Sequence, residues 1–181
     1  MPKNIISIGL DLSLTGTGVV VLNDGKIIKQ RLIKSKPVPD GKPLDEVKRI
    51  RKIVEEIELI VGDSTPTIAV IENLAFGVRN ATALTQLAAL NYFVRSMLMD
   101  YNVPFILIAP NSLKKFVTGN GAAKKDEMML AIYKRYGVSI TNDNEADAYS
   151  LSQVGLCLRE GNSKSITAFQ QEVLGLLKKQ L

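Results

Sequence analysis

The chain has 181 residues, 46% of them hydrophobic and 23% charged, which is enough for one domain that buries a core without disulfides. Its single cysteine, Cys157, cannot pair within the chain, and we expect neither a signal peptide nor a membrane span, so the composition predicts a soluble cytoplasmic protein. The net charge of +5 is compatible with a polyanionic partner such as a nucleic acid but does not require one.

The first part of the chain predicts an antiparallel meander of three strands. Residues 4–10 are an apolar, β-branched run that ends at Asp11, and residues 17–23 are a second such run. Asp24-Gly25 is typical of a tight hairpin turn, and it leads into a third strand at 26–33.

The rest of the chain predicts helices that alternate with two further strands. Each strand-helix-strand unit favours a parallel crossover. We therefore expect an α/β fold with a five-stranded mixed sheet, helices on both faces, and one domain over residues 1–181. The expected elements are a proline-rich loop at 34–43, a helix from Leu44 to about Gly62, a strand at 67–72, a helix at 80–99, a strand at 103–108, helices around 111–117, 124–136 and 143–158, and a docked C-terminal helix within 165–181.

Two acidic residues end apolar strands. Asp11 follows the first run and Glu72 is the last residue of the strand at 67–72. A carboxylate among apolar neighbours is costly unless a cation or hydrogen bonds compensate it, and functional sites in α/β sheets commonly lie at the carboxyl ends of strands. The alternatives are that Asp11 shapes the following turn through the Ser13 to Gly16 region and that Glu72 is solvated.

A third acid, Asp147, lies on the helix at 143–158 among apolar positions that face the body of the protein. Asp143 and Asn144 precede it by four and three residues and share its helix face, whereas Glu145 does not. The alternative for the cluster at 143–145 is a solvated helix start that suits the helix dipole.

These acids predict a metal site made of oxygen ligands. The chain contains no histidine, which excludes a histidine general base and a Ser-His triad. Carboxylate oxygens suit Mg²⁺ or Mn²⁺ better than zinc, and a pair of such ions is a known arrangement for phosphodiester hydrolysis.

Four segments between about residue 5 and residue 158 resemble the successive landmarks of the RuvC-type Holliday junction resolvases. The segments are GLDLSLTGTGVVVL, AVIENLAF, PNSLKKFVTGNGAAKKDEM and NEADAYSL. The resemblance implies an RNase H-like fold and a crossover junction endodeoxyribonuclease that needs Mg²⁺ (with Mn²⁺ as substitute), with two ions expected per active site. It also implies a homodimer that nicks opposed strands of four-way DNA junctions symmetrically.

The resemblance assigns roles to the acids. Asp11 would be the bridging metal ligand, Glu72 the second acid and Asp147 the last. The family usually carries Asp, and sometimes His, three residues before the last acid, where this chain has Asn144. An amide oxygen can ligate Mg²⁺ with less charge compensation, so the fourth ligand is either Asn144 or Asp143.

A basic segment and an aromatic residue would contact DNA. Lys114 and Lys125 match family lysines that approach the scissile phosphate, with Lys115 and Lys124 beside them; the alternative is an ordinary lysine-rich surface. Phe76 lies one residue later than the family aromatic that stacks on an unpaired base, and the alternative for it is a place in the core. The apolar helix at 80–99 would supply much of the dimer interface.

Three other functions compete with a junction resolvase. One is an RNase H-like nuclease for other branched DNA or structured RNA, because the loop 34–43 and the tail could alter substrate choice. Another is a catalytically impaired junction-binding module, which Asn144 keeps open. The third, an ATP-binding domain like those of actin and sugar kinases, needs a duplicated domain and a second glycine-rich segment that this chain lacks.

Overall fold

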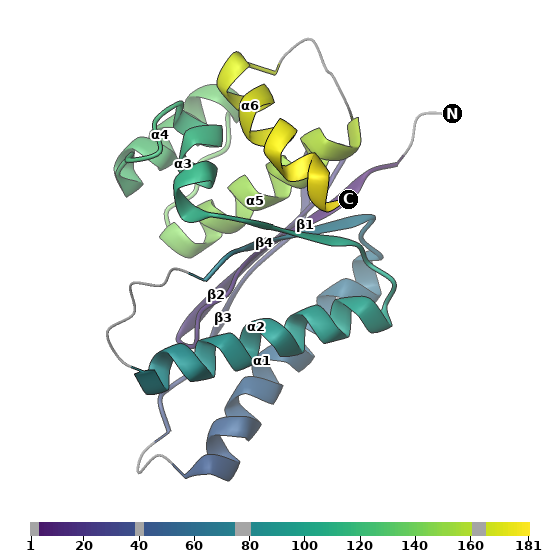
Figure 1. Ribbon diagram of the computed structural model, residues 1–181, viewed down its shortest axis with the longest axis vertical. Coiled ribbons are helices and arrows are strands. Elements are labelled where there is room, and N and C mark those ends of the chain that lie inside the picture. The colour runs from purple at the N-terminus through teal and green to yellow at the C-terminus, as the bar shows by residue number, and fades with distance from the viewer. Residues whose placement is uncertain (1–3, 39–41, 75–80, 161–165) are drawn as a thin grey trace.

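A mixed five-stranded sheet with the strand order β3-β2-β1-β4-β5 forms the centre of the computed structural model, which describes residues 4–38, 42–74, 81–160 and 166–181. Helices cover both faces of the sheet, with α1 and α2 on one side and α3 to α6 on the other (Figure 1). The strands are β1 Ile6–Asp11, β2 Gly16–Asn23, β3 Lys26–Lys34, β4 Ile68–Glu72 and β5 Phe105–Ile108. The helices are α1 Pro43–Ser64, α2 Ala81–Asp100, α3 Pro110–Thr118, α4 Lys125–Tyr136, α5 Asp143–Glu160 and α6 Ala168–Leu177, followed by the 3-10 turn Lys178–Gln180.

The predicted meander is confirmed. β2 pairs antiparallel with both β1 and β3, while β4 pairs parallel with β1 and with β5. The hairpin between β2 and β3 turns at Asp24 and Gly25, which have φ values of 45° and 83°. Two consecutive positive φ values are what a tight turn of the right twist requires. The expected α/β fold class is therefore confirmed.

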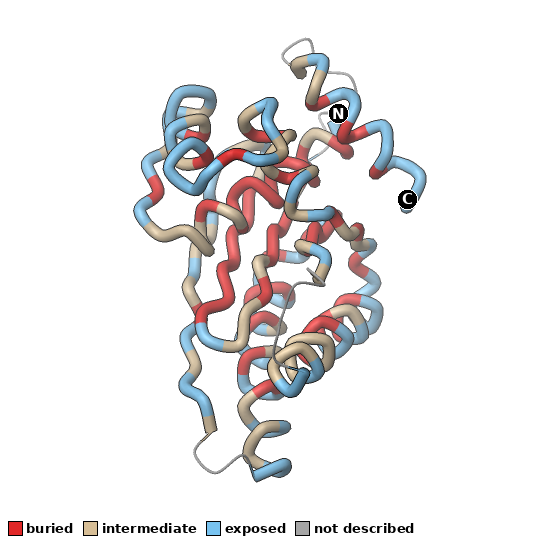
Figure 2. Tube along the Cα trace, turned by 60° about the vertical axis from the view of Figure 1, so that its left-hand side comes forward, coloured by how far each residue is buried: buried red, intermediate tan, exposed pale blue. Residues whose placement is uncertain are grey.

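Alternation along the strands divides the apolar side chains between two cores. Leu10 and Ile71 belong to the core under α1 and α2, whereas Val20 and Val70 belong to the core under α5. Red, buried segments run through the central strands in Figure 2. Successive side chains of a strand point to opposite faces, so the residues after Leu10 and Ile71 point toward α5.

Helix α5 lies unusually close to the sheet because glycines face it. A β-carbon on Gly9 of β1 would overlap the carbonyl oxygen of Ala148, and one on Gly18 of β2 would overlap that of Asn144. The helix is buried along most of its length. Because glycine has no side chain, the backbone of α5 packs directly on the backbones of β1 and β2 at these positions. The two glycines thus set the distance between α5 and the sheet.

The end of the chain packs on the same side as α5. Val173, Leu174 and Leu177 of α6 belong to the core that contains α5. Beyond α6, the Gln180 side chain accepts a hydrogen bond from the Leu107 N–H and donates one to the Leu107 carbonyl, both at 2.9 Å. A side-chain amide therefore takes the place of a neighbouring strand along edge strand β5.

Candidate active site

Asp11 and Glu72 end two adjacent parallel strands and point to the same face of the sheet. The register pairs Leu10 with Ile71, so the two acids lie on neighbouring strands one residue further on. Strand spacing places their backbones about 5 Å apart. The prediction that these strand ends meet depended on β1 and β4 being neighbours, and they are.

Asp147 faces these acids from α5. The helix turn that carries it is held against β1 at Ala148 and against β2 at Asn144. The charge of Asp147 acts on both Asp11 and Glu72, so the three carboxyls share one electrostatic environment. All three side chains are partly buried.

Burial and mutual repulsion disfavour the charged forms of these acids. Burial, followed by the charges of Asp147 and Glu72, raises the pKa of Asp11 to about 8. Burial and the charge of Asp147 raise the pKa of Glu72 to about 7, and burial also raises the pKa of Asp147. Groups with strongly shifted pKa values are typical of functional sites, although structural charge networks produce such shifts as well.

The turn after Asp11 is held by other residues. The Thr17 hydroxyl donates to the Ser13 carbonyl at 2.7 Å and accepts from the Ser13 N–H at 3.1 Å. Within the described ranges, no hydrogen bond to the Asp11 carboxylate shapes this turn, which disfavours the purely structural alternative for that residue. Its burial remains uncompensated by such bonds.

The donor chemistry of this cluster fits a hard divalent cation, but the acids do not form a complete ligand cage. In the part of the chain that the structure describes, no group of three or more His, Cys, Asp or Glu side chains could hold a metal ion as it stands. Oxygen donors from three elements nevertheless match the preference of Mg²⁺ and Mn²⁺.

The two residues predicted as alternative fourth ligands both have other partners. The Asn144 side-chain N–H donates to the Gly16 carbonyl at 2.7 Å, which leaves its amide oxygen as the atom that could ligate a cation. The Asp143 carboxylate forms an ion pair with Lys125 at 2.7 Å. Neither engagement was predictable from helix spacing, because both partners lie on distant elements.

Two of the four predicted lysines act on the acids. The charge of Lys125 lowers the pKa of Asp11 and of Asp147, and that of Lys114 lowers the pKa of Glu72 and of Asp147. The hydrogen bond to Asp143 raises the pKa of Lys125 itself. A phosphate beside the acids would therefore meet positive charge from α3 and α4.

The other two lysines are placed differently. Lys115 pairs with Glu172 of α6 at 2.7 Å, a tie between α3 and α6 that the sequence did not indicate. Lys124 is exposed and immediately precedes α4, where its backbone N–H donates to Glu127 at 2.8 Å. Phe76, the predicted stacking residue, lies outside the described residues.

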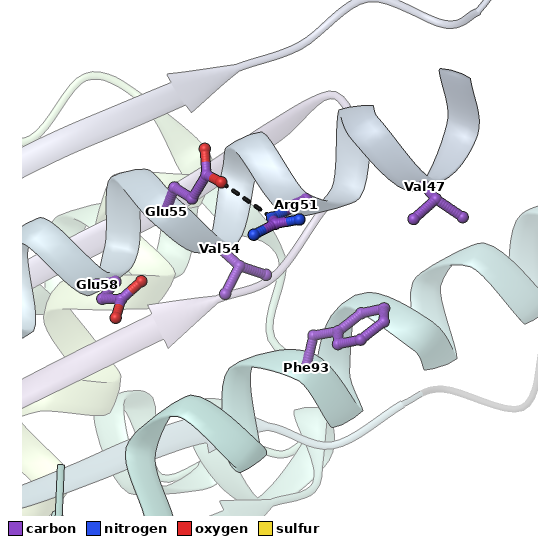
Figure 3. A pocket seen from close by; sticks show the side chains of 6 residues that line it. All are labelled: Val47, Arg51, Val54, Glu55, Glu58 and Phe93. Carbon is purple, nitrogen blue, oxygen red and sulfur yellow. Dashed lines mark hydrogen bonds and ion pairs between the residues drawn. The ribbon is translucent and has the colours of Figure 1, made fainter. Parts of the chain in front are cut away.

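A pocket lies between α1 and α2 (Figure 3). These helices cover the opposite face of the sheet from α5, which carries Asp147 (Figure 1). Its lining combines the Arg51–Glu55 ion pair at 3.1 Å with apolar side chains from both helices. The lining residues are Val47, Arg51, Val54, Glu55, Glu58 and Phe93. None of the predicted catalytic residues is among them. Among the described helices, none is long and apolar enough to cross a bilayer.

Comparisons with known proteins agree with the predicted family and with the fold. The family model for crossover junction endodeoxyribonuclease RuvC matches residues 6–154. RuvC of Prochlorococcus marinus is 25% identical over 156 residues, covering 84% of this chain and 98% of the relative. RuvC of Carboxydothermus hydrogenoformans is 27% identical over 153 residues, covering 83% and 94%.

The fold has a solved counterpart. The structure of Thermus thermophilus RuvC in complex with a Holliday junction substrate superimposes with a TM-score of 0.70 at 18% identity, covering 82% of this chain and 90% of that one. RuvC enzymes are divalent-metal-dependent nucleases, in keeping with the carboxylate oxygens of Asp11 and Glu72 at the ends of β1 and β4. The family model covers most of the chain and includes Asp11, Glu72 and Asp147, so the chain belongs to the RuvC family of crossover junction endodeoxyribonucleases.

Proposed function

We propose that the protein cleaves four-way DNA junctions by phosphodiester hydrolysis at the site formed by Asp11, Glu72 and Asp147. The observation that carries the proposal is the convergence of these partly buried acids from two strand ends and one helix, with their pKa values raised by burial and by one another. The substrate follows from family membership and from the names of its relatives.

Asp11, Glu72 and Asp147 would hold the divalent metal, with Asn144 or Asp143 as a further oxygen ligand. Mg²⁺, with Mn²⁺ as a substitute and two ions as the expected number, would supply electrophilic stabilisation of the phosphate and a more acidic attacking water. Binding requires the carboxylates in their charged form, so a cation offsets the repulsion that raises their pKa values.

The chain itself would supply position and positive charge. Lys114 and Lys125 stand where they already stabilise the charged acids, and in the complex they would neutralise charge on the scissile phosphate. Asn144, tied to Gly16 at 2.7 Å, would hold the start of α5 against β2. Lys115, Lys124 and Phe76 are proposed DNA contacts on the basis of the family resemblance alone.

We further propose that one nuclease domain spans residues 1–181 and that two copies associate through α2. Tyr92, Phe93 and Met99 of this helix are 67%, 50% and 69% exposed, so α2 presents several large apolar side chains to solvent. A homodimer could place two active sites on one junction for paired nicks. The unpaired, partly buried Cys157 suits a reducing cytoplasm.

The test is a substrate comparison with the purified protein. Four-way, three-way, flap and linear DNA of shared sequence are incubated with Mg²⁺, with Mn²⁺ and with EDTA. The proposal expects paired nicks in the four-way junction only with a divalent ion, at a rate well above that on linear DNA. Equal rates on all four substrates would reject junction selectivity, and cleavage in EDTA would reject the metal site.

A further inference from the structure

A basic pocket lies between the end of β3 and helix α1. The reaction proposed above does not use it. Lys34 ends β3, Lys36 follows it, and Arg49 and Lys52 come from α1. Glu56 is the one acidic residue in its lining, which also includes Thr15, Ser35 and Ile53. Four cationic side chains against one carboxylate leave a local excess of three positive charges.

Hydrogen bonds hold the segments that line the pocket together. Arg49 donates to the Ser35 hydroxyl at 2.9 Å and also to the Leu14 carbonyl, and the Ser35 hydroxyl donates to that same carbonyl. These bonds connect α1, the segment after β3 and the turn between β1 and β2. The turn is the one that follows Asp11, so the pocket is attached to the same loop as the first acid.

The lysines of the pocket are not neutralised within the described part of the chain. No ion pair there links a carboxylate to Lys34, Lys36 or Lys52. Lys36 and Lys52 are exposed. Two other lysines of the same elements, Lys29 of β3 and Lys48 of α1, do have acidic partners, Asp63 and Asp45. Uncompensated lysines around a hollow are suited to an anion, and a phosphate diester is the anion that this protein would meet.

The pocket lies within a few base pairs' length of the first acid. Asp11 pairs with Gly18, which pairs with Leu32, and Lys34 lies two residues further along β3. Two strand spacings and two residues of rise amount to about 12 Å. That length corresponds to roughly three to four base pairs of duplex.

We propose that this pocket binds the phosphate backbone of a duplex arm that leaves the active site past the β3 edge of the sheet. The proposal rests on the proposed DNA substrate and adds a second contact region to it. Contacts of this kind set the orientation of the duplex and carry no sequence information. The pocket would therefore orient the junction relative to Asp11, because it would bind an arm at a point several base pairs from the branch point.

The experiment measures binding without cleavage. Affinity for a four-way junction is followed by fluorescence anisotropy in EDTA over a series of salt concentrations, with the wild type, the double variant Lys36→Glu/Lys52→Glu and the control Lys26→Glu. Lys26 is an exposed lysine at the opposite end of β3. Arg49 is left intact because it holds the turn, and circular dichroism verifies that each variant is folded.

The double variant should bind about 10- to 100-fold more weakly, and the slope of log affinity against log salt should fall by about 2, since two phosphate contacts are lost. A second junction carries neutral methylphosphonates about three to four base pairs from the branch point. This substitution should weaken the wild type and Lys26→Glu but have little further effect on the double variant.

Two results would overturn the proposal: a loss no larger than that of Lys26→Glu, or a loss of equal size on substituted and unsubstituted junctions. Competition by inorganic phosphate at matched ionic strength, removed by the double variant, would instead assign the pocket to a small anion and would overturn it too. Failure of the wild type to cut junctions in Mg²⁺ would reject the nuclease function and leave the binding result interpretable.

Discussion

Gly18 of β2 lies so close beneath Asn144 of α5 that a β-carbon on the glycine would overlap the Asn144 carbonyl oxygen. Gly18 is also the register partner of Asp11. The glycine therefore sets the distance between the strand that carries the first acid and the helix that carries the last. The absence of a side chain at this position is part of the construction of the candidate active site.

Replacing Gly18 with alanine should push α5 away from the sheet. Overpacking of this kind typically costs about 1–3 kcal/mol in the free energy of unfolding, and here it should also reduce junction cleavage by at least about 10-fold because Asp147 moves relative to Asp11. Thermal unfolding and single-turnover cleavage measure the two effects. Gly175→Ala in α6 is the matched control, since nothing lies within 4 Å of its β-carbon position. If Gly18→Ala behaves like this control, the close packing does not position the site.

The metal-free protein should lose stability as the pH rises from about 5 to 8. Asp11 and Glu72 have pKa values of about 8 and 7 in the folded chain against ordinary values of 3.8 and 4.5. In this interval the native state binds more protons than the unfolded state, so the free energy of unfolding falls with rising pH, by an amount on the order of a few kcal/mol.

Urea denaturation in EDTA across this pH range tests the sign. Asp11→Asn should flatten the dependence and be more stable than the wild type at pH 8, whereas Asp63→Asn, at an exposed acid paired with Lys29, should preserve it. Stability that increases with pH in the wild type would mean that the acids are not buried against one another.

Much of the fold and the core of the site could be predicted from sequence because they depend on local periodicity. Apolar runs that end in Asp11 and Glu72 define both the strands and the positions of the acids at the strand ends. Partners that lie far away in sequence could not be predicted, such as Gly16 for Asn144 and Glu172 for Lys115. The basic pocket could not be predicted either, since its residues come from the end of β3, the segment after it, the turn before β2 and α1, and only the tertiary fold brings them together.

Removing the charge of Lys125 should shift the pH dependence of cleavage toward higher pH. Its charge lowers the pKa values of Asp11 and Asp147, so Lys125→Met should raise both and leave fewer carboxylates ionised at neutral pH. The midpoint of the rate profile in Mg²⁺ is the readout, with Lys134→Met at the other end of α4 as the control. A lower rate with an unmoved midpoint would assign Lys125 to DNA binding alone.

Gln180 should protect the edge of the sheet. Its side chain pairs with both polar backbone groups of Leu107 in β5, so Gln180→Ala should cost about 1 kcal/mol and expose these groups to other chains. Thermal unfolding and light scattering on heating measure the effect. Gln171→Ala, at an exposed position of α6, should change neither. Identical scattering for the two variants would argue against a protective role.

We propose that Asp11, Glu72 and Asp147 form one metal-dependent catalytic site, and a single substitution tests this. The most direct measurement is single-turnover cleavage of a four-way junction in Mg²⁺ by the wild type and by Asp11→Asn, together with junction binding by both. We expect Asp11→Asn to bind the junction and to cut it at least about 100-fold more slowly than the wild type. Cleavage by Asp11→Asn at the wild-type rate would contradict the assignment of the site.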